Sequence, residues 1–207
     1  MRAKGSGFIA AGLLLIALAF GLTGYNLYDS ARAGLSAETA LMQLDALQPS
    51  PQTDAENADA LTLADTEQPE NLLTPDMEMP VKAIDGVDYI GILRIPALEL
   101  QLPIAAQWSY STLNTAPCRY VGTAYKDGFV ICAHNYDAHF GRIKQLREGD
   151  TVTFIDVDGN EYNYVATALE TLLPTAVDEM TSTDWALTLF TCTIGGQYRV
   201  TLRCDRA

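Results

Sequence analysis

Basic residues are scarce in this chain of 207 residues, and they are not grouped. Thirteen lysines and arginines stand against 26 aspartates and glutamates, which gives a formal net charge of −13. Proteins that bind nucleic acid need a basic patch to neutralise phosphates, and the sequence contains no such patch. The composition therefore excludes nucleic acid as a partner.

Residue types that bind metals are also few. The chain has two histidines, His134 and His139, and four cysteines, none of them in the C-x-x-C spacing typical of zinc sites. No group of carboxylates is specific enough to indicate a calcium site. We therefore expect no metal site and no cofactor.

One long stretch lacks charge altogether. The twenty-four residues between Lys4 and Asp29 carry no charged side chain, and about 20 apolar residues are enough to cross a bilayer. Basic residues precede the stretch and acidic residues follow it, so the positive-inside rule predicts a single-pass anchor in the cell membrane, with a cytoplasmic amino terminus and an extracellular domain. The alternative is a cleaved signal peptide, because residues 31–33, Ala-Arg-Ala, have the small-x-small form, although late for cleavage.

Acidic residues are concentrated directly after that stretch. Residues 29–85 hold twelve Asp/Glu and two Lys/Arg, whereas residues 86–207 hold fourteen and nine. An acidic, proline-containing segment buries too little apolar surface to offset its chain entropy, although leucines between 35 and 47 allow a short helix. The predicted organisation is a cytoplasmic end and transmembrane anchor over residues 1–28, an acidic flexible linker over 29–85, and one folded domain over 86–207.

The folded domain alternates short β-type runs with turns. A strong hairpin signal, Asp158-Gly159-Asn160, separates two of the runs. Many short strands, little helix and no repeats predict an all-β domain, a closed or nearly closed β-barrel. The predicted strands are Tyr89–Ile95, Leu98–Ile104, Tyr120–Tyr125, Phe129–Ala133, Thr151–Val157, Glu161–Leu169, Ala186–Thr191 and Tyr198–Arg203.

A cysteine stands where one of these runs ends. Cys192 leaves the strand for a turn containing two glycines, and Arg199 follows seven residues later. A thiol with the ordinary pKa of about 8.5 is mostly protonated at neutral pH, so a nucleophilic cysteine needs a base or a positive neighbour. His134 follows the run Phe129–Ala133 and is the candidate base, and Arg199 is the candidate positive neighbour. The alternative for Cys192 is a small, buried apolar side chain.

These residues resemble the signature of the sortase family, Thr-Leu-x-Thr-Cys followed by a strand that carries an arginine. Thr188–Cys192 and Arg199 match it, and the resemblance continues upstream through Ala133-His134-Asn135 and residues 139–150 to residues 89–96. It covers roughly residues 86–207 and implies the closed eight-stranded sortase-type β-barrel, preceded by a transmembrane helix and linker. Sortases are membrane-anchored cysteine transpeptidases, and the subclass stays open, with B-like and D-like as the candidates.

The resemblance also implies a role for each residue. Cys192 attacks a carbonyl in a sorting signal of Leu-Pro-x-Thr-Gly type and holds the acyl group as a thioester. His134 protonates the leaving amine and deprotonates the incoming one, while Arg199 stabilises the oxyanion or the substrate carbonyl. Thr191 binds substrate or simply fills the strand. The partners implied are surface proteins with a carboxy-terminal sorting signal, and an amine from a peptidoglycan precursor or a pilin-like lysine.

Several alternatives stay open at this level. His139 competes with His134 for the role of base, and Arg203 competes with Arg199, because both arginines lie on one face of the strand. Tyr136 and Trp185 are interpreted as packing aromatics. The pairing of the remaining cysteines is undecided; they are Cys118, Cys132 and Cys204.

Two other functions are also compatible with the sequence. One is a different cell-surface cysteine acyltransferase, similar to L,D-transpeptidases, although that family expects an arginine much closer to the cysteine. The other is a non-catalytic, membrane-tethered β-barrel that binds wall polymer or a protein partner, in which Cys192 is packed and inert.

Overall fold

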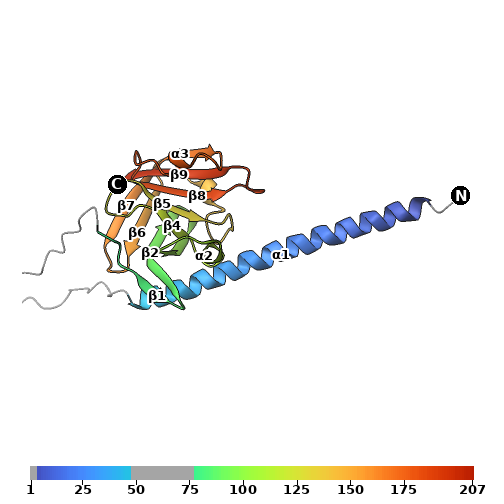
Figure 1. Ribbon diagram of the computed structural model, residues 1–207, viewed down its shortest axis with the longest axis horizontal. Helices are drawn as coiled ribbons and strands as arrows, with labels where there is room; N and C mark the ends of the chain where they lie inside the picture. Colours follow the sequence, from blue (N-terminus) through green and yellow to red (C-terminus); the bar gives the residue numbers. More distant parts are fainter. Residues whose placement is uncertain (1–3, 48–76) are drawn as a thin grey trace, which may run out of the picture.

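The computed structural model describes residues 4–47 and 77–207, and it consists of one long helix and a nine-stranded sheet (Figure 1). The long helix is α1 (Lys4–Leu47), and the short helical elements are η1 (Pro96–Leu98), α2 (Tyr110–Leu113), η2 (Ile143–Gln145) and α3 (Val177–Met180). The strands are β1 (Lys82–Ile84), β2 (Val87–Ile95), β3 (Leu100–Ala105), β4 (Cys118–Val121), β5 (Phe129–Ala133), β6 (Thr151–Asp156), β7 (Glu161–Leu172), β8 (Leu187–Cys192) and β9 (Arg199–Arg206).

The sheet closes on itself. Its order is β1-β2-β3-β4-β5-β8-β9-β7-β6, and β6 pairs back onto β2. Strands β2 to β9 therefore form a closed eight-stranded barrel, as predicted, and β1 extends the sheet by pairing with the first residues of β2. Closure leaves the barrel strands without a free edge, which protects them from pairing with other chains.

The seam between β2 and β6 requires a glycine. Gly91 pairs with Asp156 across the seam, and a Cβ atom at position 91 would lie 2.1 Å from the backbone oxygen of Ile155. A contact this short is not possible between real atoms, so any side chain at position 91 would push the two strands apart.

Strand β4 ends earlier than the sequence predicts. The run Tyr120–Tyr125 was expected as a strand, but β4 ends at Val121. The next residue, Gly122, has a φ of +80°, and a Cβ atom there would lie 2.1 Å from the backbone oxygen of Gly128. The chain therefore turns at Gly122, because the two backbones approach too closely for a continued pleat.

The strands at the centre of the sheet are buried on both faces. On the inner face, Phe129 of β5 packs edge-on against Phe154 of β6, with ring centroids 5.2 Å apart. On the outer face, Cys132 of β5 and Phe190 of β8 belong to a second apolar cluster that includes Met180 of α3. Because both faces of β5 and β8 are packed, the residues at the ends of these strands are held in fixed positions.

Helix α1 lies along the barrel over its second half. One stripe of its side chains is buried, namely Ala33, Ala37, Ala40 and Leu44, at the three- and four-residue spacing of one helix face. The short alanine side chains allow the helix to approach the barrel closely, whereas Leu35 points to solvent. The short helix that the leucines predicted is thus a continuation of α1, and its packing depends mainly on alanines.

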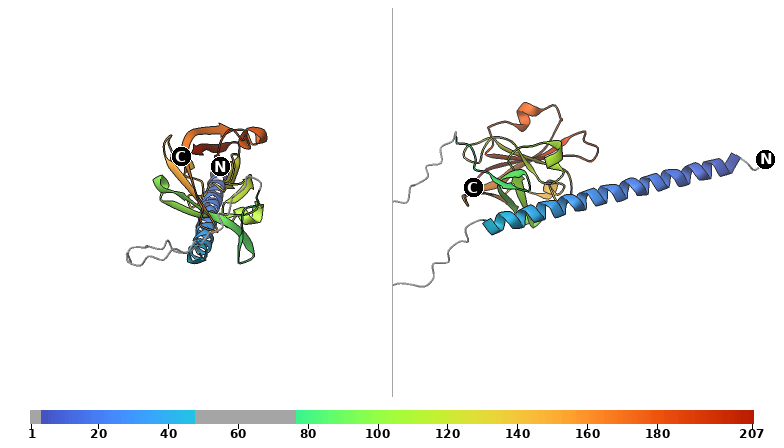
Figure 2. Two further views of the ribbon diagram at one scale, coloured as in Figure 1. Left: turned by 90° about the vertical axis from the view of Figure 1, so that its left-hand side faces the viewer. Right: turned by 60° about the horizontal axis from the view of Figure 1, so that its bottom comes forward.

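The first half of α1 extends beyond the barrel (Figures 1 and 2). By length and composition this helix can cross a membrane, with a mean hydropathy of 2.1 in its most apolar window. Helix α1 passes residue 28 without a break, and residues 48–76 of the expected linker lie outside the described residues. The division into anchor, linker and domain therefore stays a prediction.

Candidate active site

The register of three neighbouring strands brings the expected site residues to one end of the barrel. Strands β5 and β8 are parallel neighbours, and Ala133 pairs with Thr191. The next residue on each strand, His134 and Cys192, therefore leaves the sheet at the same level. Strands β8 and β9 are antiparallel, and Cys192 stands directly opposite Arg199. In Figures 1 and 2 the turn between β8 and β9 points to the side on which α1 protrudes.

These three residues line a common cavity of about 210 Å³. The rest of its wall is largely apolar and comes from strands β4, β5 and β8, from helices α2 and α3, and from the loops next to them. Tyr120 connects two of the aromatic rings, with centroids 5.8 Å from Trp108 and 5.4 Å from Phe190. The further lining residues are Tyr110, Leu113, Cys132, Ala133, Pro174, Val177, Met180 and Thr191. An apolar wall with a few convergent polar groups is typical of a ligand site.

Cys192 differs from the other cysteines in its environment. All four thiols are free, but Cys118, Cys132 and Cys204 are buried whereas Cys192 is partly exposed. Burial raises the pKa of Cys118 and of Cys204 to about 12 and also raises that of Cys132. Since a neutral buried thiol is a poor nucleophile, Cys192 is the cysteine best placed to react.

Cys192 also borders a second hollow, of about 370 Å³, on the other side of β8. Asn135, Asp137 and Lys144 contribute polar groups to this hollow, and Ile194 of the β8–β9 turn lies at it with 91% of its surface exposed. The thiol is therefore accessible from two directions, one mainly apolar and one more polar.

His134 is half-buried beside the thiol. Its Nε2 atom lies 3.2 Å from Oδ1 of Asn114, and its ring centroid is 5.0 Å from that of Tyr136. Burial lowers the pKa of His134, and the negative charge of Asp29 acts against this effect. The neutral form is thus favoured, as suits a group that takes up and returns a proton.

The competing histidine, His139, is fully buried between α1 and the barrel loop that carries it. Burial lowers its pKa to about 4, so it stays neutral at ordinary pH and does not line the cavity that contains Cys192. Its place in the fold favours a packing role and leaves His134 as the candidate base.

Arg199 lies at the start of β9, where its Nη1 atom donates to the carbonyl oxygens of Gly196 and Tyr198 at 3.0 and 3.3 Å. These bonds hold the guanidinium at the β8–β9 turn. The group is partly exposed and lines the cavity beside Cys192, so its other N–H groups are available to a ligand.

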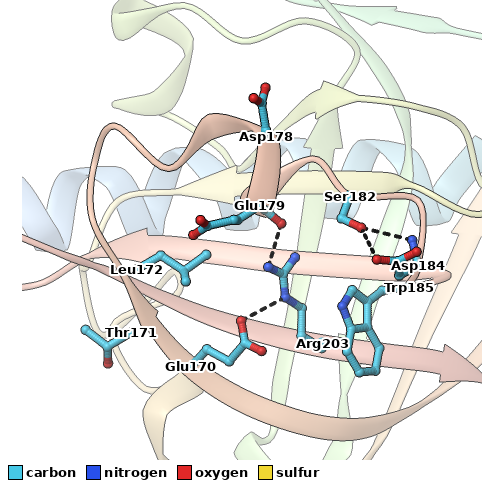
Figure 3. Close-up of a pocket in the computed structure, with 9 residues that line it drawn as sticks. All are labelled: Glu170, Thr171, Leu172, Asp178, Glu179, Ser182, Asp184, Trp185 and Arg203. Carbon is cyan, nitrogen blue, oxygen red and sulfur yellow. Dashed lines mark hydrogen bonds and ion pairs between the residues drawn. The ribbon is translucent and has the colours of Figure 1, made fainter.

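The competing arginine, Arg203, lies in a different hollow, with residues of β7 and of the segment around α3 (Figure 3). Only 2% of its surface is exposed. Its Nε atom lies 3.3 Å from a carboxylate oxygen of Glu170, and Nη2 donates to the carbonyl of Glu179 at 2.7 Å. The hollow around it, about 830 Å³, is larger than the cavity at Cys192 but contains neither the thiol nor His134. Arg203 therefore ties α3 to the barrel.

The hydroxyl of Thr191 is already engaged. It is buried and donates to the carbonyl oxygen of Ala133 at 2.8 Å. This bond links β8 to β5 directly before Cys192 and His134. The side chain thus contributes to the alignment of the two strands, and a role in substrate binding stays a prediction.

Sequence reasoning missed three residues near the imidazole. Tyr136 was expected to pack, but its hydroxyl donates to the carboxylate of Asp29 on α1, and Asn114 reaches His134 from the far side. The position of Asp29 as the first charge after the apolar stretch was the one available signal. Within residues 4–47 and 77–207, no three His, Cys, Asp or Glu side chains are grouped to hold a metal ion.

Fold and cavity together define a class: a closed β-barrel with a partly exposed cysteine, a histidine and an arginine at the ends of adjacent strands. A model of the sortase domain matches residues 93–207, more than half of the chain. The chain therefore belongs to the sortase family, whose members are cysteine transpeptidases acting on cell-surface proteins.

Solved structures agree with this assignment. Sortase C from Clostridium perfringens SM101 is 24% identical with a TM-score of 0.52, over 58% of this chain and 70% of that chain. Clostridium perfringens sortase C with the C-terminal cell wall sorting motif is 26% identical with a TM-score of 0.52, over 58% and 71%. Sortase A from Corynebacterium diphtheriae is 21% identical with a TM-score of 0.53, over 58% and 61%. No curated protein sequence matches this chain.

Proposed function

We propose that this sortase cleaves a sorting signal of Leu-Pro-x-Thr-Gly type in surface proteins and transfers the acyl group to an amine. The observation that carries the proposal is the convergence of Cys192, His134 and Arg199 on one cavity. The acceptor is an amine of a peptidoglycan precursor or a lysine of another surface protein. The subclass stays open, because the similar structures include sortases of classes A, C and D.

The reaction proceeds in two acyl transfers through a thioester. The thiol of Cys192 gives its proton to His134, and the resulting thiolate attacks the carbonyl carbon of the scissile bond. The carbon–nitrogen bond then breaks, and the leaving amine takes the proton from His134. In the second half, His134 removes a proton from the incoming amine, which displaces the sulfur. The aromatic wall supports this assignment, because an apolar surface excludes water from the thioester.

The guanidinium of Arg199 stabilises the negative oxygen that forms in each half-reaction. Its position opposite Cys192 supports this role, and so does the apolar cavity wall, because electrostatic stabilisation is larger where water is excluded. Thr191 assists by aligning the strand ends and by offering its backbone to the substrate.

The chain acts at the outer face of the cell membrane. We assign α1 as an uncleaved anchor with a cytoplasmic amino terminus, supported by two basic residues before the apolar stretch and by the acidic residues after it. The small-x-small segment at 31–33 lies inside α1, and Ala33 is buried against the barrel. A site packed in this way is a poor substrate for a signal peptidase.

Mass spectrometry of the full chain in detergent micelles tests the proposal. Incubation with a Leu-Pro-x-Thr-Gly peptide and triglycine should give a peptide–triglycine product and, before the amine is added, a thioester adduct. Cys192→Ala should give neither. Cys132→Ala is the matched control, since Cys132 lines the same cavity but is buried, and it should keep the adduct.

Two results would contradict the proposal. An adduct that survives Cys192→Ala would place the chemistry on another residue. A folded wild-type chain that forms no adduct with any sorting peptide would favour the non-catalytic binding module. An L,D-transpeptidase-like enzyme would instead react with a peptidoglycan tetrapeptide, which therefore serves as a second substrate in the assay.

A further inference from the structure

The loop that carries His134 is clamped against α1. After β5 the chain passes through residues 134–141 before it reaches η2. Gly34 of α1 lies so close to this loop that a Cβ atom at position 34 would be 3.0 Å from Cβ of Ala138. Inside the loop, a Cβ atom at Gly141 would lie 2.5 Å from the backbone oxygen of Asn135. Little room remains for the loop to move unless α1 moves as well.

Tyr136 connects the helix to the imidazole. Its hydroxyl donates to the carboxylate of Asp29, and its ring lies beside both histidines of the chain. The ring centroids are 5.0 Å apart for His134, with an interplanar angle of 43°, and 5.6 Å apart for His139, with an angle of 50°. The orientation of the tyrosine ring therefore limits the orientations open to His134.

We propose, on the basis of the proposed function, that Asp29 is a positioning residue for His134. It acts through Tyr136: the carboxylate holds the phenol, and the phenol ring holds the imidazole toward Cys192. The helix that anchors the chain thus also completes the active site. The sequence supports this reading, because Asp29 is the first charged residue after the charge-free stretch and is therefore expected at the membrane surface, level with the loop.

The charges around His134 make Asp29 well suited to this role. The hydrogen bond from Tyr136 lowers the pKa of Asp29, and so does the guanidinium of Arg32, 3.2 Å from the carboxylate. Asp29 thus stays ionised and favours the imidazolium form of His134 against the effect of burial. The titratable and charged groups near His134 are Asp29 and Arg32 from α1, Tyr136 and His139 from its own loop, and Cys192 and Arg199 across the cavity.

The first test does not require activity. The full chain, labelled with ¹³C-histidine in detergent micelles, contains two imidazoles, and His134→Gln assigns them. We expect Asp29→Asn to lower the proton affinity of His134 by roughly threefold, because a nearby negative charge is removed. Asp45→Asn is the matched control: Asp45 is on the same helix but lies near Gln101, 3.4 Å from its Nε2 atom, and the titration of His134 should not change.

The second test measures transpeptidation by the same variants. Asp29→Asn should lower kcat by roughly five- to tenfold with little change in KM, because Asp29 does not line the cavity at Cys192. Asp29→Glu should recover most of the loss. Tyr136→Phe keeps the ring but loses the hydroxyl, so it should have a similar effect, and the double variant should be no worse than either single one. If Asp29→Asn does not fold, Tyr136→Phe is measured in its place.

The outcomes are distinct. If Asp29→Asn and Tyr136→Phe match Asp45→Asn in both the titration and kcat, Asp29 does not position His134 and the inference is overturned. An additive double variant would also overturn it, since two independent effects would then be present. If the wild-type chain is inactive but Asp29→Asn still shifts the titration of His134, the proposed function fails and the positioning contact stands.

Discussion

At the scale of single residues, side chains of the same type differ in their surroundings. Cys192 and Cys132 line the same cavity, but only Cys192 is partly exposed, since its strand ends at that point. His134 faces the cavity and His139 is enclosed. Arg199 is held at a turn, and Arg203 is saturated by buried oxygens. The candidate cysteines, histidines and arginines between which the sequence did not decide thus differ in burial. Paired substitutions test each choice.

Replacement of Arg199 should lower activity, whereas replacement of Arg203 should lower stability. Arg199→Ala should lower kcat/KM by roughly 100-fold with little change in stability, as expected when one donor to an oxyanion is lost. Arg203→Ala should lower the free energy of unfolding by roughly 3 kcal/mol, because Glu170 and the oxygens of Met180, Glu179 and Thr188 lose their donor.

Peptide-cleavage kinetics and urea unfolding of the same preparations measure both effects. Arg206→Ala is the control on the same strand. Its ion pair with Asp127 is exposed and should contribute little to stability, and its other contacts are one bond to the carbonyl oxygen of Ala124 and the ring of Tyr164, so the loss should be clearly smaller than for Arg203→Ala. A larger loss of kcat/KM in a folded Arg203→Ala variant would identify Arg203 as the functional cation.

The pH dependence of kcat/KM should be bell-shaped, because the reaction needs one protonated and one ionised group. Burial lowers the pKa of His134. The midpoint of the limb that reports this histidine should therefore lie below about pH 6.5, the ordinary pKa of histidine. Initial rates from pH 4 to 10 measure the profile. His134→Gln should lose roughly 100-fold or more, whereas His139→Phe should keep the bell shape; a flat wild-type profile would rule out this pairing.

At the scale of elements, α1 and the loop after β5 pack against each other. The helix contributes an alanine stripe to the packing, and the loop places His139 beneath it. The histidine is buried in its neutral form, so this contact should be sensitive to acid.

Stability should therefore fall as the pH is lowered. The unfolded chain binds a proton at His139 below about pH 6.5, whereas burial holds the folded pKa at about 4. Protonation thus favours the unfolded state between these values, and the loss from pH 7 to pH 5 should be roughly 2 kcal/mol. Urea unfolding of wild type and His139→Phe at both pH values measures it; the variant should lose clearly less, and an equal loss would assign the effect to other groups.

At the scale of the whole molecule, closure of the barrel depends on the seam between β2 and β6. The seam joins Gly91–Arg94 to Thr153–Asp156, residues far apart in the chain. Because closure fixes the relative positions of all eight strands, it also fixes the edge at which Cys192, His134 and Arg199 meet.

Substitution of the seam glycine should destabilise the entire barrel. Gly91→Ala would place Cβ against the backbone of Ile155, and relief of that contact should lower the free energy of unfolding by roughly 3 kcal/mol. Gly149→Ala is the control: position 149 has open space around it and a φ of +92°, so the cost should be about 1 kcal/mol from backbone strain alone. Thermal melts followed by circular dichroism compare the two; equal losses would show that the seam adapts.

Much of the fold could be predicted from the sequence because it depends on local pattern. Alternating apolar residues and the Asp158-Gly159-Asn160 turn predict the strands, and an apolar stretch predicts the long helix. The end of β4 could not be predicted, because it depends on the close approach of Gly122 to Gly128. The unbroken course of α1 past residue 28 could not be predicted either, because its alanine stripe is stabilised by packing against the barrel.

By itself, the sequence determined the family, the β-type domain and the three residues expected at the site, because these follow from motifs and from residues near one another in the chain. The tertiary structure decided which histidine and which arginine face the thiol, and it brought Asp29 to Tyr136 across 107 residues. The physical reason is that burial and long-range contact arise only when the sheet closes and α1 packs on it. No local pattern of residues encodes those distances.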